Sequence, residues 1–202
     1  PDWIIWLPGL VTGLNVACRA VDGEVLTATP IYPPFLSAPH FSGRKLNRAE
    51  LACTVDGWHF DQNALKAALT ADTRLFLLCH PHNPVGRCWS REELLDLAAL
   101  AEENDLIVCS DEIHCGLILD AEKRHIPFAS LSPAAAKRCI TLMAPSKTFN
   151  IAGLGCALSG GHGNRPGSDD NFSLTHAIAR SLVNHDGLHQ IVWIATNDLR
   201  RQ

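Results

Sequence analysis

The chain alternates between short, continuous apolar runs and segments in which apolar residues recur at helical spacing. Three of the runs, at residues 74–79, 106–110 and 139–143, have the length and composition of strands buried in a parallel sheet. Between the first two, an S-x-x-E capping box at 90–93 opens a segment with helical apolar spacing, 91–103. We therefore predict that the three strands lie side by side and mostly parallel, with helix 91–103 on one face of the sheet.

Weaker signals extend this pattern along the chain. Apolar spacing predicts a helix over 11–21, and a second helix begins at the capping residue Asp61 and ends near Leu69. The remaining expected segments are strands at 24–28 and 156–159, an extended stretch at 45–54 and a short helix near 132–137. Strands and helices that alternate at these lengths predict an α/β fold of three layers, in which helices flank a mostly parallel sheet.

The character of the chain changes after Gly160. Residues 160–170 are polar and rich in glycine, which predicts a loop or linker. Two later segments could form helices: 174–183 and 188–195. We therefore divide the chain into an α/β domain, 1–160, and a loop with a divergent tail, 161–202. Because the chain begins at Pro1 rather than Met, we expect a fragment or a processed form.

Composition narrows the class of protein. The 202 residues, 47% of them hydrophobic, suffice for one globular domain, and a net charge of −4 provides no basic stripe for nucleic acid. No apolar run has membrane-spanning length, and no signal segment opens the chain. The eight cysteines include no CxxC pair, and Cys79, Cys109 and Cys139 lie in apolar runs, as buried free thiols do. We expect a reducing, cytoplasmic location with no membrane or nucleic-acid partner. His80 and His82 lack further ligands at metal-binding spacing, so we predict no metal site.

Polar residues follow the three buried strands: Asn83, Asp111 and Lys147. In a parallel α/β sheet all three emerge at the carboxyl edge, where such folds bind ligands. A lysine partly desolvated there could attack carbonyl groups, and a buried aspartate needs a cation such as a pyridinium nitrogen. Asn83 could donate to a phenolate oxygen, and Tyr32, which lies between prolines, could stack on a ring. Together these residues are the parts of a pyridoxal phosphate site.

These residues also have simpler interpretations. Lys147 could be a surface lysine in a loop, and Tyr32 could be a packed loop residue. Thr12 lies in the first turn of helix 11–21, where N–H groups and a hydroxyl can hold a phosphate, although the same turn suits a plain capped helix. The glycines within 153–160 could suggest a nucleotide-binding α/β protein, but their spacing does not fit GxGxxG.

Five stretches, in order from Pro8 to Leu154, resemble the aspartate aminotransferase fold type of pyridoxal-phosphate enzymes. They read PGLVTGL, TPIYPPF, LLCHPHNPVGRCWSREEL, VCSDEIH and MAPSKTFNIAGL. Within that group the sequence is most similar to the cystathionine β-lyase, or C–S lyase, branch, for which the DEIH form is typical. The resemblance implies the large domain of an enzyme that acts on a small amino-acid substrate and is a homodimer when full length.

The resemblance also implies a role for each matching residue. Lys147 would hold the cofactor covalently and carry a proton, Asp111 would pair with its pyridine nitrogen, and Tyr32 would stack on its ring. Asn83 and His114 would lie near its phenolic oxygen. Three further residues would lie at or near its phosphate: Val11, Thr12 and Ser146.

Two positions depart from the pattern of many relatives. Ala144 stands three residues before the lysine, where many have Ser or Thr, and this weakens the phosphate site. Gly155 stands eight residues after it, where many aminotransferases have Arg, although this departure is usual in the lyase branch. The family's N-terminal arm and its small C-terminal domain, which normally carries the arginine for the substrate carboxylate, are not visible. We therefore expect a chain truncated at both ends.

These observations predict a C–S β-lyase that depends on pyridoxal phosphate and cleaves cystathionine or a related cysteine thioether to a thiol, pyruvate and ammonia. Two alternatives stay open. One is an aminotransferase of amino acids, because both reactions begin with loss of the α-proton to the lysine. The other is a truncated, inactive copy that serves only as a binding or regulatory module.

Overall fold

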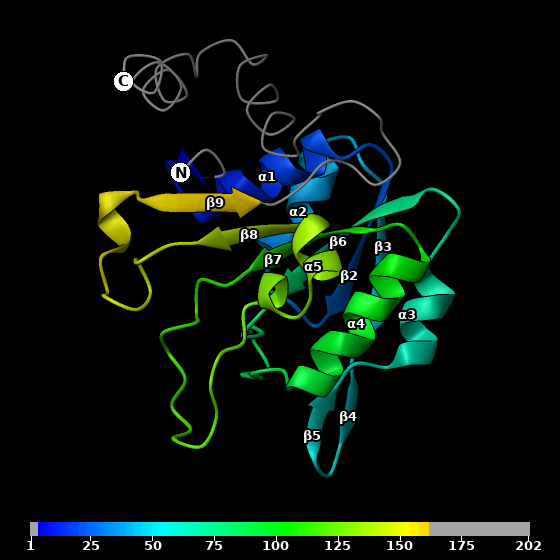
Figure 1. Ribbon diagram of the computed structural model, residues 1–202. Helices are drawn as coiled ribbons and strands as arrows, with labels where there is room; N and C mark the ends of the chain where they lie inside the picture. Colours follow the sequence, from blue (N-terminus) through cyan, green and yellow to red (C-terminus); the bar gives the residue numbers. More distant parts are fainter. Residues whose placement is uncertain (1–3, 162–202) are drawn as a thin grey trace.

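Seven strands form the main sheet of the computed structural model, which describes residues 4–161 (Figure 1). They are β1 (Ile4–Leu7), β2 (Glu24–Thr29), β3 (Leu46–Glu50), β6 (Thr73–Cys79), β7 (Ile107–Asp111), β8 (Cys139–Met143) and β9 (Ala157–Gly161). Their order across the sheet is β1-β9-β8-β7-β6-β2-β3. Neighbours from β8 to β3 are parallel, whereas β9 is antiparallel to both of its neighbours. The mostly parallel sheet predicted from the sequence is therefore confirmed.

The three central strands confirm the prediction from the apolar runs, because β6 pairs with β7 and β7 pairs with β8, both in parallel. Successive side chains on a strand point to opposite faces of the sheet. On β6, Leu75 and Leu77 accordingly join one hydrophobic cluster, and Phe76 and Leu78 join another. A continuous apolar run is thus the sequence of a strand that is covered on both sides.

Helices cover the two faces separately. One face packs against α1 (Leu10–Ala20) and α2 (Pro34–Phe41). The other packs against α3 (Gln62–Ala68), α4 (Arg91–Glu103) and α5 (Pro133–Lys137), and Figure 1 shows α4 in front of the sheet. Two short 3₁₀ turns are η1 (Phe128–Ser130) and η2 (Ala152–Leu154). These are the three layers that the sequence predicts.

Local capping sets where two of the helices begin. The Oγ of Ser90 accepts the N–H of Glu93 at 3.2 Å, and the Glu93 carboxylate accepts the N–H of Ser90 at 2.8 Å. The Asp61 carboxylate likewise accepts the N–H groups of Asn63 and Ala64 at the start of α3. Both caps provide acceptors for N–H groups that the first turn of a helix leaves unbonded.

Two segments differ from the sequence prediction. The stretch 45–54 is not one extended run, because after β3 the chain enters β4 (Ala52–Thr54), which pairs in an antiparallel hairpin with β5 (Gly57–His59). The sequence does not predict α2, since it contains Pro34 and Pro39. Pro34 is tolerated because it lies in the first turn, and the helix ends two residues after Pro39.

The predicted division of the chain at residue 160 stays a prediction. β9 extends through Gly161, and the helices predicted over 174–183 and 188–195 lie outside the described residues. Within residues 4–161, no helix combines the length and the apolar character needed to cross a membrane.

Candidate functional site

A cavity of about 250 Å³ lies at the carboxyl ends of the central strands, next to the start of α1. Its lining includes seven of the eight predicted site residues: Val11, Tyr32, Asn83, Asp111, His114, Ser146 and Lys147. Thr12, the eighth, lies in the first turn of α1 and is not among the lining residues. The edge of the sheet thus brings together side chains that are far apart in the sequence.

Lys147 reaches the cavity from the turn that follows β8. The N–H of Phe149 donates to the carbonyl of Pro145 at 2.9 Å, and the N–H of Ile151 donates to the carbonyl of Ser146 at 3.0 Å. The Lys147 side chain is exposed, which corrects the expectation of partial desolvation. The reason is that the lysine lies in an open turn beyond the strand, where its amine is accessible to a ligand.

Asp111 ends β7 on the face of the sheet that α1 covers. Its side chain is buried, and burial raises the pKa of its carboxyl group to about 7. The N–H of Ile113, which donates to Oδ1 at 3.1 Å, lowers this pKa, and the charge of Glu112 raises it. Among the described residues, that N–H is the one hydrogen-bond donor to the carboxylate. A cation in the cavity would favour the ionised form of Asp111.

Asn83 and Tyr32 are held together by the backbone, because the N–H of Tyr32 donates to the carbonyl of Asn83 at 3.0 Å. The N–H of Asn83 in turn donates to Sγ of Cys79 at 3.4 Å. The Cys79 thiol donates to the carbonyl of Pro81 at 3.3 Å, and burial raises the pKa of this thiol to about 12. Sequence reasoning missed this role of Cys79. Its position at the end of β6, directly opposite Asp111, is the signal that could have indicated it.

His114 also lines the cavity, three residues after Asp111. Partial burial lowers the pKa of its imidazole from the ordinary value, and the nearby Lys147 charge lowers it further. A neutral imidazole can either donate or accept a hydrogen bond, depending on its tautomer. His114 can therefore serve as a hydrogen-bond partner for a ligand oxygen close to Lys147.

The start of α1 is the anion-attracting end of the cavity. Its N-cap is Gly9, no side chain of the described residues caps it, and its first turn holds no acidic residue. Uncapped N–H groups at a helix start favour a phosphate.

Gly155 lines the same cavity with φ +56°, and a Cβ there would lie 3.3 Å from the carbonyl oxygen of Pro8. An arginine at Gly155 would need a left-handed backbone in a tight space, which is a physical reason for this departure from the aminotransferase pattern.

The family model for aminotransferase class I and II matches residues 2–162, which is most of the chain. The chain belongs to this family. It is 43% identical over 158 residues to cystathionine beta-lyase PatB of Bacillus subtilis, with 76% of this chain and 41% of that protein covered. The family and the fold class expected from the sequence are therefore confirmed.

Solved structures support the same fold. The crystal structure of OvoB is 42% identical with a TM-score of 0.82, and the match covers 95% of this chain and 50% of that one. Cystalysin from Treponema denticola, which contains a pyridoxal 5′-phosphate cofactor, is 34% identical with a TM-score of 0.79, covering 89% and 44%. The chain thus spans half or less of the length of these aminotransferase-family relatives.

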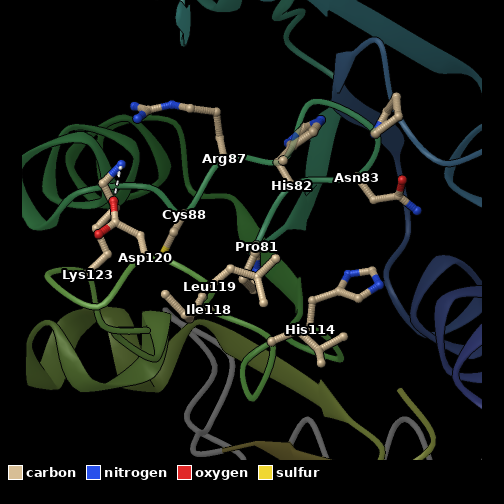
Figure 2. Close-up of a pocket in the computed structure, with 13 residues that line it drawn as sticks. Pro81, His82, Asn83, Arg87, Cys88, His114, Ile118, Leu119, Asp120 and Lys123 are labelled. Carbon is tan, nitrogen blue, oxygen red and sulfur yellow. Dashed lines mark ion pairs between the residues drawn. The ribbon is translucent and has the colours of Figure 1, made fainter. Parts of the chain in front are cut away.

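A second, more open pocket of about 460 Å³ adjoins the cavity that Asp111 and Lys147 line, and the two share Asn83 and His114. In Figure 2, the segment after β6, which carries Arg87, faces the connection after β7, which carries Leu119 and Lys123. The two segments, which carry Asn83 and His114, are therefore separated by open space over part of their length.

The two histidines of the turn after β6 are used inside the fold. Both are buried; Nε2 of His80 lies 3.0 Å from the carbonyl oxygen of Ile126, and Nε2 of His82 lies 2.9 Å from that of Pro30. Residues 4–161 hold no group of three or more His, Cys, Asp or Glu side chains arranged to bind a metal ion. All eight cysteines have free thiols.

Proposed function

We propose that the complete protein is a C–S β-lyase that depends on pyridoxal phosphate. It would convert cystathionine or a related cysteine thioether, together with one water molecule, to a thiol, pyruvate and ammonia. The observation that carries the proposal is the convergence of Lys147, Asp111, Asn83 and Tyr32 on one cavity. Relatives named cystathionine beta-lyase, at 43% and 33% identity, support the choice of the lyase branch.

The residues of the cavity fit pyridoxal phosphate by their chemistry. Asp111 is a buried carboxyl with a raised pKa and one donor among the described residues, so a pyridinium nitrogen would complete its environment. Lys147 has an exposed amine for a covalent bond to the aldehyde. The uncapped start of α1, with Val11, would hold the phosphate, and we assign Thr12 and Ser146 to the same group.

The remaining cavity residues would fix the ring. Asn83 and His114 can donate hydrogen bonds to a phenolic oxygen, and Tyr32 can cover one face of the ring with its own. Tyr32 is 41% exposed, so it can adjust to a ring that enters the cavity. The backbone hydrogen bond between Tyr32 and Asn83 would keep the residue that stacks on the ring close to the residue that donates to its phenolic oxygen.

When bound, pyridoxal phosphate supplies a sink for the electron pair released at the α-carbon of an amino acid. Asp111 would hold positive charge at the pyridine nitrogen and so favour that role. Nζ of Lys147 would take the proton from the α-carbon and could then give it to the departing sulfur. Loss of the Cβ–S electron pair to sulfur releases the thiol, and water converts the remaining three-carbon unit to pyruvate and ammonia.

Pyruvate release from cystathionine by the full-length protein tests this proposal. We expect pyruvate and thiol in equal amounts, together with visible absorbance from the protein-bound cofactor. An S-alkyl cysteine tests the breadth of the thioether class, and serine, which lacks the sulfur, is the matched control. Exchange between an amino acid and a keto acid without pyruvate would identify an aminotransferase instead. Neither activity, with no absorbance, would identify an inactive copy.

We also propose that the full-length protein is a homodimer. Apolar side chains of Val11 and Tyr32 line the cavity and are 43% and 41% exposed, and Phe149 and Leu154, which flank the lysine turn and the cavity, are 69% and 73% exposed. A second subunit could cover these residues. Light scattering coupled to size-exclusion chromatography would show the mass of a single subunit if the proposal is wrong.

The eight free thiols support a reducing, cytoplasmic location, which cell fractionation can test.

A further inference from the structure

Glu112 is a fully buried carboxylate that the proposed chemistry does not use. Its Oε1 accepts the Oγ–H of Ser110 at 2.9 Å and the backbone N–H of Phe128 at 3.0 Å. Its Oε2 lies 2.8 Å from Nε2 of His125, whose side chain is 9% exposed. Glu112 therefore joins the end of β7 to the far end of the connection that follows it.

His80 extends this network to the turn after β6. Its ring packs against that of His125 with 4.5 Å between centroids, and its Nε2 lies 3.0 Å from the carbonyl oxygen of Ile126. Burial lowers the pKa of His80 to about 4, and the neighbouring His125 lowers it too, so this imidazole is neutral and can donate from Nε2. The backbone N–H of His80 donates to the carbonyl of Asp111 at 2.9 Å.

The same network reaches β8, because the N–H of Glu112 donates to the carbonyl of Leu142 at 2.8 Å. Ser110, Glu112, His125 and His80, with the N–H of Phe128, thus connect three segments. These are the turn that carries Asn83, the strand end that carries Asp111 and His114, and the strand that leads to Lys147. We call this set of contacts the Glu112 clamp.

We propose that the Glu112 clamp positions the cofactor-facing residues, with Glu112 and His125 as positioning residues. Beyond the clamp, the segment after β6 and the connection after β7 face each other across the open pocket in Figure 2. Contacts at the bases of the two segments would therefore help to set the spacing of Asn83 and His114, together with the hydrogen bonds of Asn83 to Cys79 and of His114 to the carbonyl of Pro81. This inference rests on the proposed function, because it assigns those residues to the cofactor.

The chemistry of the clamp explains why an acid and a histidine are used here. A buried carboxylate is costly unless several donors surround it, and Glu112 has three. Ser110 lies on β7 two residues before Glu112, whereas His125 and Phe128 lie at the far end of the connection, so satisfying the carboxylate requires that end of the connection to return to the end of β7. Removing the carboxylate would leave the buried donors of Ser110 and Phe128 unbonded and would release the connection.

The test measures binding of pyridoxal phosphate to the cofactor-free, full-length protein and the visible absorbance of the complex against pH. Glu112→Ala should weaken binding about tenfold, the effect of losing one buried hydrogen bond of this kind, and should shift the absorbance profile along the pH axis. Glu112→Gln should bind pyridoxal phosphate with an affinity within about threefold of wild type, because the amide oxygen of glutamine can still accept from Ser110 and Phe128. His125→Ala should act in the same direction as Glu112→Ala.

Thr27→Val is the matched control for a purely structural effect. Thr27 is fully buried and its Oγ1 donates to the carbonyl of Leu77 at 2.9 Å, so its loss also removes a buried side-chain hydrogen bond. It should lower the melting temperature without changing the affinity or the absorbance profile. If Glu112→Ala behaves like Thr27→Val, the positioning role is wrong. If Glu112→Ala does not fold, His125→Ala decides the question in the same way. Wild-type protein that does not bind pyridoxal phosphate would refute the proposed function instead.

Discussion

Asp111 and Glu112 are adjacent buried acids, yet the fold surrounds them in opposite ways. Asp111 points to the face covered by α1, lines the cavity and has one donor, the N–H of Ile113, among the described residues. Glu112 lies on the face covered by α4 and has three donors, with no contact to the cavity. The difference arises because Asp111 is the last residue of β7 and Glu112 follows it directly, and successive side chains along an extended chain point to opposite faces of the sheet.

This comparison separates a carboxylate whose hydrogen-bond donors all lie within the fold from one that lines a cavity with a single donor. Buried polar groups are normally satisfied within the protein, so Glu112 follows the rule and Asp111 departs from it. A buried acid with a raised pKa in a cavity is a candidate functional group, and here a specific cation would complete it. Burial alone therefore does not mark a candidate functional residue, whereas a buried acid that lines a cavity with a single donor is such a candidate.

The largest effect that we predict concerns the cavity that Asp111 lines, and in particular Lys147. Lys147→Ala should abolish the visible absorbance of the cofactor complex and lower pyruvate release by roughly 10⁴-fold, because one amine serves as covalent anchor and proton carrier. Lys123→Ala is the control, since Lys123 lines the neighbouring pocket and pairs with Asp120 at 3.3 Å. Retained absorbance in Lys147→Ala would show that another group binds the cofactor.

A second prediction concerns the stability of the cofactor-free protein. Because burial raises the pKa of Asp111 to about 7, the folded state keeps this proton at pH values where the unfolded chain has lost it. The contribution of Asp111 to stability is thus fully present below about pH 4 and is lost as the pH rises to about 7. Asp111→Asn cannot ionise, so relative to wild type it should gain up to about 4 kcal/mol over this range. Denaturant unfolding at several pH values measures the free energy of unfolding of both proteins. A difference between Asp111→Asn and wild type that does not change with pH would contradict the prediction.

The third prediction concerns the same residue with cofactor bound. Asp111→Asn should retain the covalent bond to Lys147, and therefore visible absorbance, but should lower turnover on the order of 10²-fold. The reason is that an uncharged amide stabilises positive charge at the pyridine nitrogen poorly. Stopped-flow measurement of α-proton loss, with deuterium at the α-carbon, would locate the slow step. Turnover equal to wild type would remove Asp111 from the proposed chemistry. Together with the stability prediction, this result would show whether one residue trades stability for function.

The sequence predicts much of the fold because its signals are local. Each central strand is a continuous apolar run, and the start of α4 is set by Ser90 and Glu93, three residues apart. The same reasoning places Asn83, Asp111 and Lys147 at one edge, since the carboxyl ends of parallel strands meet there. These predictions need only the period of the pattern and the direction of the strands.

The features that sequence reasoning missed depend on contacts between distant segments. Glu112 and His125 are 13 residues apart across an irregular connection, so no periodic pattern pairs them. The bond from Asn83 to Cys79 requires the particular shape of the turn after β6. The exposure of Lys147 depends on how far its turn extends beyond β8. Strand ends can therefore be predicted more readily than the side-chain networks that hold them.

The smallest effect that we predict tests whether the clamp or the whole α4 face controls the site. Ser90→Ala removes half of the capping box at the start of α4, on the same face of the sheet as Glu112, and should cost about 1 kcal/mol of stability. Ser90 itself lines neither of the two pockets near the site, so cofactor affinity and absorbance should match wild type. Calorimetry and a cofactor titration on the same sample measure both quantities. If affinity falls with Ser90→Ala as much as with Glu112→Ala, a general loss of packing on the α4 face explains both results. The specific positioning role of the Glu112 clamp would then be wrong.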